Sequence, residues 1–142
     1  MVVNRSSRAW RWFSAACAAA LLGGCRPETP KAYPVVGSVV YKGAAAPAVR
    51  LAGTTIYWES LSEPSRDFAQ ATVEGDGSFM AATIVNDKNV NGAPLGEYRG
   101  RLSPPRAGLL DPRFEKYETA GLRLTVAPRP NLVTIEVEPP PP

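Results

Sequence analysis

Histidine is absent from this chain of 142 residues, and cysteine occurs only twice. The lack of histidine excludes Ser-His-Asp triads, histidine general bases and the usual zinc sites. Aspartate, glutamate, lysine and tyrosine remain for acid-base chemistry, but no pair of carboxylates stands out from the surface charge, and no serine lies in a Gly-x-Ser-x-Gly sequence. We therefore predict a protein that is not an enzyme and that has no cofactor and no metal site.

Long apolar runs are also scarce. The main one extends from Trp12 to Leu22 and is shorter than the roughly 20 residues that a transmembrane helix needs. It follows a basic start with three arginines and precedes two glycines. This layout is typical of a secretory signal peptide, which is removed from the mature protein.

Residues 21 to 25, Leu-Leu-Gly-Gly-Cys, resemble a bacterial lipobox. The resemblance implies cleavage before Cys25 and acylation of the Cys25 sulfur, so Cys25 is the predicted lipid-attachment site. An ordinary signal peptide with a chance cysteine is the alternative interpretation. We divide the chain into a lipoprotein signal peptide (1–24), a proline-rich tether (25–34), a β-sandwich domain (35–138) and a proline tail (139–142). In polyproline conformation the ten tether residues would span about 30 Å.

Cleavage would change the charge and the cysteine content. Three of the 16 basic residues and none of the 13 acidic ones precede Cys25, so the side chains of the mature chain would carry 13 minus 13, or no net charge. Without a run of Lys and Arg with interleaved aromatics, nucleic-acid binding has no support. Cys17 would leave with the signal peptide, so a disulfide scaffold is excluded. The remaining 118 residues suffice for one domain.

Seven short runs are β-branched or alternate between apolar and polar residues, and turn residues close each of them. They are residues 35–41, 54–58, 68–73, 79–83, 97–102, 122–126 and 133–137. The sequence Glu-Gly-Asp-Gly at 74–77 predicts a hairpin between the third and fourth runs. Prolines and glycines interrupt every helical pattern, so we predict an all-β fold, an antiparallel seven-stranded Greek-key sandwich. The side chains expected to face its core are those of Ile56, Trp58, Phe79, Leu124, Val126, Val133, Ile135 and Val137.

Three of these segments carry a family pattern. The matching residues are Val35, Gly37 and Val39, then Thr72, Gly75 or Gly77, and Phe79, with Val73 in place of an aspartate, and finally Gly92, Ala93, Pro94, Gly96 and Tyr98. In this pattern the chain resembles small lipoproteins of planctomycete-type bacteria that carry a transthyretin-like, carboxypeptidase-regulatory-like domain. The resemblance implies a transthyretin-like (prealbumin-like) fold. Because the matching residues belong to turns and core, it implies no activity.

Two short stretches suggest sharper functions. Asp87 to Gly92 reads Asp-x-Asn-x-Asn-Gly, the first half of a calcium loop, but an EF-hand needs glutamate where Tyr98 stands, and these residue types are also those of a polar turn. Tyr98-Arg99-Gly100 resembles part of the Tyr-Arg-Gly-Ser terminus of hydroxyisourate hydrolases, which have the transthyretin-like fold. Their chemistry needs histidines and a C-terminal position for that segment, and both are missing here.

We therefore predict a membrane-tethered extracytoplasmic lipoprotein, anchored by lipid to the periplasmic or outer face of a membrane. Its domain is expected to act in envelope structure or to bind another protein or a glycan, without nucleic acid as a partner. Arg26 occupies the place where aspartate retains proteobacterial lipoproteins in the inner membrane, which favours an outer location. The alternatives are a calcium-stabilised adhesion module and a histidine-free hydrolase of the transthyretin-like fold.

Overall fold

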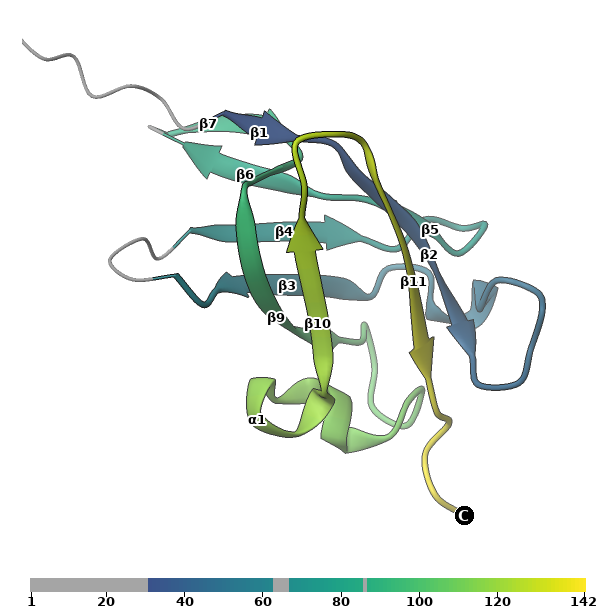
Figure 1. The fold of residues 1–142 in the computed structure, drawn as a ribbon. Coiled ribbons are helices and arrows are strands. Elements are labelled where there is room, and N and C mark those ends of the chain that lie inside the picture. The colour runs from purple at the N-terminus through teal and green to yellow at the C-terminus, as the bar shows by residue number, and fades with distance from the viewer. Residues whose placement is uncertain (1–30, 63–66, 86) are drawn as a thin grey trace, which may run out of the picture.

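The computed structural model describes residues 31–62, 67–85 and 87–142, and this part of the chain is mostly β (Figure 1). The predicted signal peptide, Cys25 and the tether up to Pro30 lie outside the described residues. The described chain enters beside β1 (Ala32–Tyr33) and ends at the opposite end of the domain. A tether joined to β1 would therefore leave the domain at the end opposite to the C-terminus.

The larger sheet has six strands and is antiparallel throughout. They are β3 (Thr55–Ser60), β4 (Phe68–Thr72), β6 (Ala82–Val85), β7 (Lys88–Asn91), β9 (Gly96–Ser103) and β10 (Leu122–Val126). Their order across the sheet is β10-β9-β3-β4-β6-β7. Along β3, Ile56 and Trp58 are buried while Tyr57 between them is half-buried, because successive side chains of a strand point to opposite faces.

The smaller sheet has three strands, β2 (Val35–Tyr41), β5 (Ser78–Met80) and β11 (Asn131–Val137), with β2 in the middle. β11 runs parallel to β2, which corrects the expectation of a wholly antiparallel arrangement. Alternation of apolar residues reports which face of a strand is buried and is the same for either direction. The direction depends on how the chain crosses from β10 in one sheet to β11 in the other.

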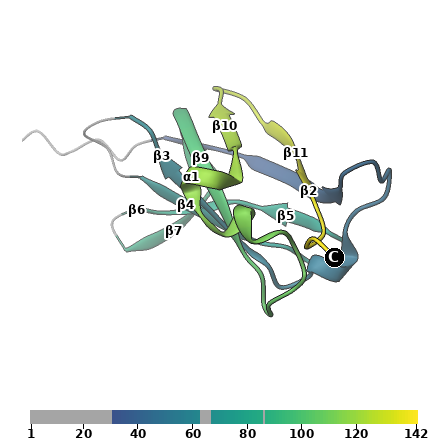
Figure 2. The ribbon, with the colours of Figure 1, turned by 90° about the horizontal axis from the view of Figure 1, so that it is seen from below.

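Short elements complete the described part of the chain. β1 pairs with β8 (Ala93–Pro94), and two 3₁₀ turns, η1 (Val49–Leu51) and η2 (Pro112–Glu115), lie in connections. The single-turn helix α1 (Tyr117–Ala120) follows η2, and both pack against β9 (Figure 2). Gly121, in the left-handed conformation at φ 67°, ends α1.

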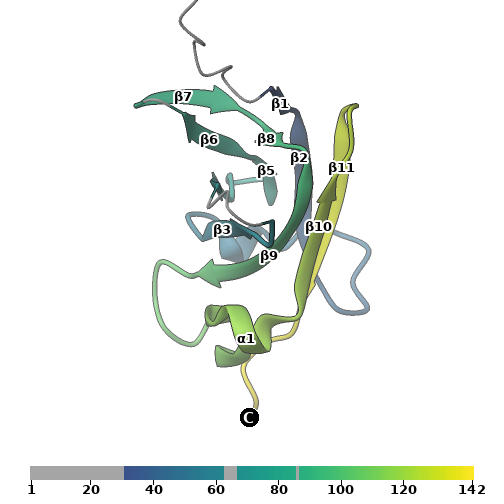
Figure 3. The same ribbon diagram turned by 60° about the vertical axis from the view of Figure 1, so that its left-hand side comes forward.

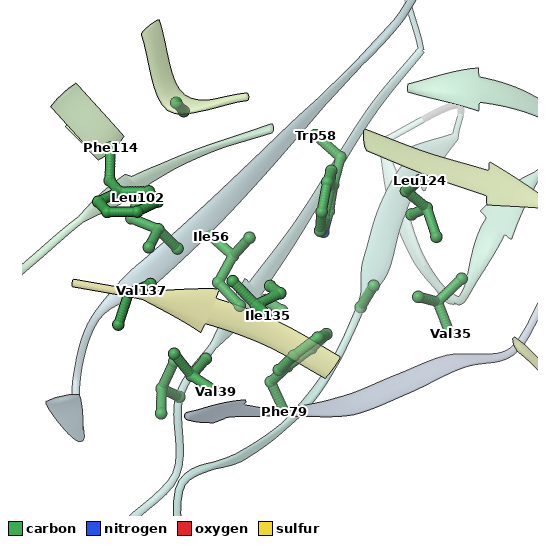
Figure 4. Packing of buried hydrophobic residues seen from close by; sticks show 14 of the residues in the cluster. Val35, Val39, Ile56, Trp58, Phe79, Leu102, Phe114, Leu124, Ile135 and Val137 are labelled. Atoms are coloured by element: carbon green, nitrogen blue, oxygen red, sulfur yellow. The ribbon is translucent and has the colours of Figure 1, made fainter. Parts of the chain in front are cut away.

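The two sheets enclose one apolar core (Figure 4). Seven of the eight side chains predicted to be inward are buried, and Val133 is partly buried against them. The core also takes residues that the pattern did not single out, among them Val35, Val39, Leu51, Leu102 and Phe114. Burial of these side chains from water is the main favourable term for the fold.

The predicted hairpin after β4 is only partly correct. The turn at 74–77 forms, with the Ser78 carbonyl accepting a hydrogen bond from Glu74 N at 2.7 Å. The run that follows divides at Ala81, because β5 pairs with β2 and β6 pairs with β4. Phe79, Ala81 and Thr83 are all buried, so the period-2 pattern continues through the crossing and does not reveal it.

Within the stretch Asp87 to Gly92, expected as a polar turn, Lys88–Asn91 form strand β7 instead. β7 pairs with β6 from Val85 opposite Lys88 to Ala82 opposite Asn91, and Asp87, just before β7, has φ 61°. Pairing with β6 gives these backbone groups hydrogen-bond partners, although the sequence around them carries no strand signal. The polar residues therefore form the edge strand of the sheet.

Candidate functional site

Cys25, the predicted lipid-attachment residue, lies outside the described residues. The described domain offers a different candidate, the outer face of the six-stranded sheet. The inward residues of this sheet belong to the core, and the residues between them form two parallel rows that cross the strands. We name them the first row and the second row.

The register of the strands defines the first row. Arg101 lies opposite Tyr57, Tyr57 opposite Gln70, Gln70 opposite Ala82 and Ala82 opposite Asn91. The row therefore runs from β9 through β3, β4 and β6 to β7, with a cation and an aromatic ring at one end and amides toward the other.

The second row lies two residues along each strand. Arg123 of β10 is opposite Arg99, Arg99 is opposite Glu59, and Glu59 is opposite Phe68. At the other end of this row, on β6 and β7, Ile84 is opposite Asn89. Phe68 and Ile84 expose 51% and 61% of their surface, so the middle of this face is apolar and open to solvent.

Arginines and tyrosines meet at one end of the face. The Arg101 guanidinium lies 4.4 Å from the centre of the Tyr57 ring and 5.4 Å from that of Tyr117 in α1. Arg99 lies 5.3 Å from the Tyr117 ring. Burial raises the pKa of Tyr117 above its usual range, while a hydrogen bond from Arg101 acts in the opposite direction. Stacking between two rings holds the Arg101 guanidinium in a defined orientation.

The charges at this end are only partly paired. Nε and Nη2 of Arg99 both lie 2.6 Å from Oε2 of Glu59, and both side chains are about one third exposed or less. Arg101 and Arg123 form no salt bridge with any carboxylate of the described residues. Two arginines thus flank one neutralised pair.

The amide end of the face opens into a groove of about 910 Å³. Gln70, Asn89 and Asn91 line it from the larger sheet, and Met80 and Leu132 line it from the smaller one. Leu132 is 84% exposed. The groove combines side-chain amides with apolar walls, which is the usual composition of a ligand site.

A second hollow, of about 540 Å³, lies where β10 and β11 run side by side (Figure 3). Its polar lining residues are Arg123, Thr125, Arg129, Asn131 and Thr134. Among the residues that the structure describes, no aspartate or glutamate lines it, and Glu74 is the single acidic one that lines the groove at the amide end.

The structure separates the three residues of the Tyr98-Arg99-Gly100 segment. Tyr98 is buried, its hydroxyl donates a hydrogen bond to the Pro94 carbonyl at 2.9 Å, and burial raises its pKa to about 12. Arg99 belongs to the outer face. Gly100 lies beneath Trp58, where a Cβ atom would stand 2.5 Å from the indole ring. The three residues therefore do not form one site, and only Arg99 contributes to the outer face of the sheet.

The candidate calcium residues are spread along an extended strand. Cα atoms in β7 advance by about 3.4 Å per residue, so Asn89 and Asn91 are laid out along the sheet edge, whereas a calcium loop gathers its oxygens around one point. Within residues 31–62, 67–85 and 87–142, no three Asp, Glu, Cys or His side chains are grouped as metal ligands. Nor does any helix in these ranges have the length and apolar character to cross a membrane.

Comparison with known proteins found no matching family model, no matching curated protein and no matching solved structure. Sequence reasoning missed the two rows because their members come from six strands. The spacing Tyr-x-Glu at 57–59 and Arg-x-Arg at 99–101 was the available signal, since residues two apart share a face of a strand.

Proposed function

We propose that the protein is a membrane-tethered extracytoplasmic lipoprotein whose β domain is a non-enzymatic module that binds another component of the cell envelope. Cys25 carries the lipid, the residues from Cys25 to the start of β1 at Ala32 are the tether, and the domain is a transthyretin-like Greek-key sandwich. The observation that carries the binding role is the outer face of the larger sheet, where exposed Phe68 and Ile84 share a face with Arg101 and Arg123, which have no described carboxylate partner.

A surface of this kind favours binding over catalysis. Exposed aromatic and apolar side chains cost solubility, and a face that keeps them open together with unpaired cations marks an interaction site. A histidine-free hydrolase would need two or more acidic groups in one pocket, and neither described hollow is lined by two acidic side chains.

The anchoring role is tested at Cys25. We expect mass spectrometry of the membrane-extracted protein to find an acylated N-terminal Cys25. We expect the Cys25→Ala variant to accumulate as an uncleaved precursor or to leave the membrane, because the sulfur that accepts the lipid is missing. Asp76→Ala serves as a control that leaves the signal region intact. A soluble mature form that begins at another residue would contradict the proposal.

A further inference from the structure

We propose that the outer face of the six-stranded sheet binds an acidic polysaccharide that carries carboxylate groups. Arg101 and Arg123 pair with its carboxylates, and a sugar ring lies on the exposed Phe68. The inference rests on the proposed role as an envelope-binding module and names the class of its partner.

The arginine end determines the charge of the partner. Arg101 is oriented by the Tyr57 and Tyr117 rings at 4.4 and 5.4 Å, so its planar fork loses little freedom when it meets a carboxylate. Arg99 is already neutralised by Glu59. Arg101 and Arg123 lie on either side of that pair, on β9 and β10, and present two separated positive charges.

The shape of the face favours an extended polymer. Strands in a sheet lie about 4.8 Å apart, so the first row, which crosses five strands, extends over about 19 Å, and the second row, which crosses six, over about 24 Å. Phe68 offers an exposed ring in the middle of the second row, and Gln70, Asn89 and Asn91 offer donors and acceptors toward the groove. An aromatic ring can stack on a sugar face, and side-chain amides can hydrogen-bond to its hydroxyl groups.

The margins of the face argue against a membrane surface. Glu97, opposite Thr125, lies beside the arginine end, and Glu74 lines the groove. A uniformly anionic lipid surface would be repelled by both carboxylates. A polysaccharide whose carboxylates are spaced along it can pair with the two arginines without placing a carboxylate beside Glu97 or Glu74.

The test uses the full chain, purified in a non-ionic detergent, and two forms of one polymer. Isothermal titration calorimetry measures binding to polygalacturonate and to the same polymer with its carboxylates fully methyl-esterified. We expect the esterified form to bind at least tenfold more weakly, and binding of polygalacturonate to weaken as salt rises.

Variants then assign the contact. Arg101→Gln should weaken polygalacturonate binding at least tenfold, because a charged hydrogen-bonded pair is lost. Phe68→Ala should weaken binding of both polymers. Arg50→Gln, at an exposed arginine of η1 outside the face, should leave the affinity unchanged. Circular dichroism melts verify that each variant is folded.

Three results would overturn the inference. They are equal affinity for both polymers, equal affinity of Arg101→Gln and Arg50→Gln, and Arg101-dependent binding to phosphatidylglycerol vesicles without binding to polygalacturonate. If any of these occurs while the chain still fractionates with envelope membranes, the partner class is wrong and the proposed function stands. If the chain fractionates with the cytosol, the proposed function itself fails.

Discussion

At the scale of single residues, glycine and tyrosine at the start of β9 show how the fold depends on close contacts. Gly100 is opposite Trp58 across β3 and β9, and its missing side chain makes room for the indole. Tyr98, two residues earlier, is buried, and its hydroxyl donates a hydrogen bond to the Pro94 carbonyl. Both residues point to the core, on the opposite side of β9 from Arg99 and Arg101 of the outer face.

Gly100→Ala is expected to lower the free energy of unfolding by about 1 to 3 kcal/mol, because the added methyl group overlaps the Trp58 ring and the core must shift. Urea unfolding followed by tryptophan fluorescence measures the loss. Gly75→Ala is the matched control, since nothing lies within 4 Å of a Cβ atom there. Equal stabilities of the two variants would mean that the indole does not occupy this space.

Tyr98→Phe is expected to lower the free energy of unfolding by about 1 to 3 kcal/mol at pH 7, because the buried Pro94 carbonyl loses its partner. The folded pKa of Tyr98, about 12, exceeds the usual value of 10.0, so the folded state holds the proton more tightly. This contribution is fully present below pH 10 and is lost as pH rises toward 12.

The difference in stability between the parent and Tyr98→Phe should therefore shrink by about 1 kcal/mol between pH 9 and pH 11. Urea unfolding of both proteins at each pH measures it, and other titrating groups cancel in the difference. A gap that stays constant over this range would contradict the raised pKa of Tyr98.

At the scale of elements, the turn between β10 and β11 carries the chain from one sheet to the other. The Asn131 side chain organises it, with Oδ1 accepting from Ala127 N at 2.9 Å and Nδ2 donating to the carbonyls of Ala127, Arg129 and Pro34. Asn131 is 8% exposed. One amide thus ties the turn to the beginning of β2.

Asn131→Ala is expected to cost about 2 to 4 kcal/mol of unfolding free energy, because several partly buried backbone groups lose a partner together. Asn131→Asp keeps the acceptor but loses the donors and places a charge in a buried site, so it should cost at least as much. Thr134→Ala, at an exposed position of β11, is the control. A loss below 1 kcal/mol for Asn131→Ala would show that the turn forms without the amide.

At the scale of the whole molecule, the described domain has one core to which both sheets contribute. A single core in a domain of this size favours unfolding in one cooperative step. In the chain from Cys25 onward, Trp58 is the single tryptophan, and it is 1% exposed. Its fluorescence therefore reports on the interior between the sheets.

We expect the emission of Trp58 to be blue-shifted in the folded domain and to move to the red on unfolding. The fluorescence transition in urea should coincide with that of far-UV circular dichroism, and Trp58→Ala should cost about 3 to 5 kcal/mol. Two separate transitions would show that the sheets unfold independently.

Local chemistry was enough to predict the class of fold and the position of most strands. Residues 35–41 and 122–126 each form one strand with the predicted bounds. Four of the other runs lie in strands whose ends differ by one or two residues, and the run 79–83 divides between β5 and β6. β-branched residues, period-2 alternation and turn residues are properties of a few neighbouring positions, so the sequence displays them directly.

Tertiary structure alone decided the pairing of strands, and with it the candidate site. The parallel partner of β2, the division of the chain at Ala81 and the strand at Lys88–Asn91 depend on contacts between distant segments. Arg101 meets Tyr57 and Tyr117 because three segments converge, and periodicity within each segment carries no information about its neighbour. Register, which only the folded sheet determines, turned separate polar residues into two continuous rows.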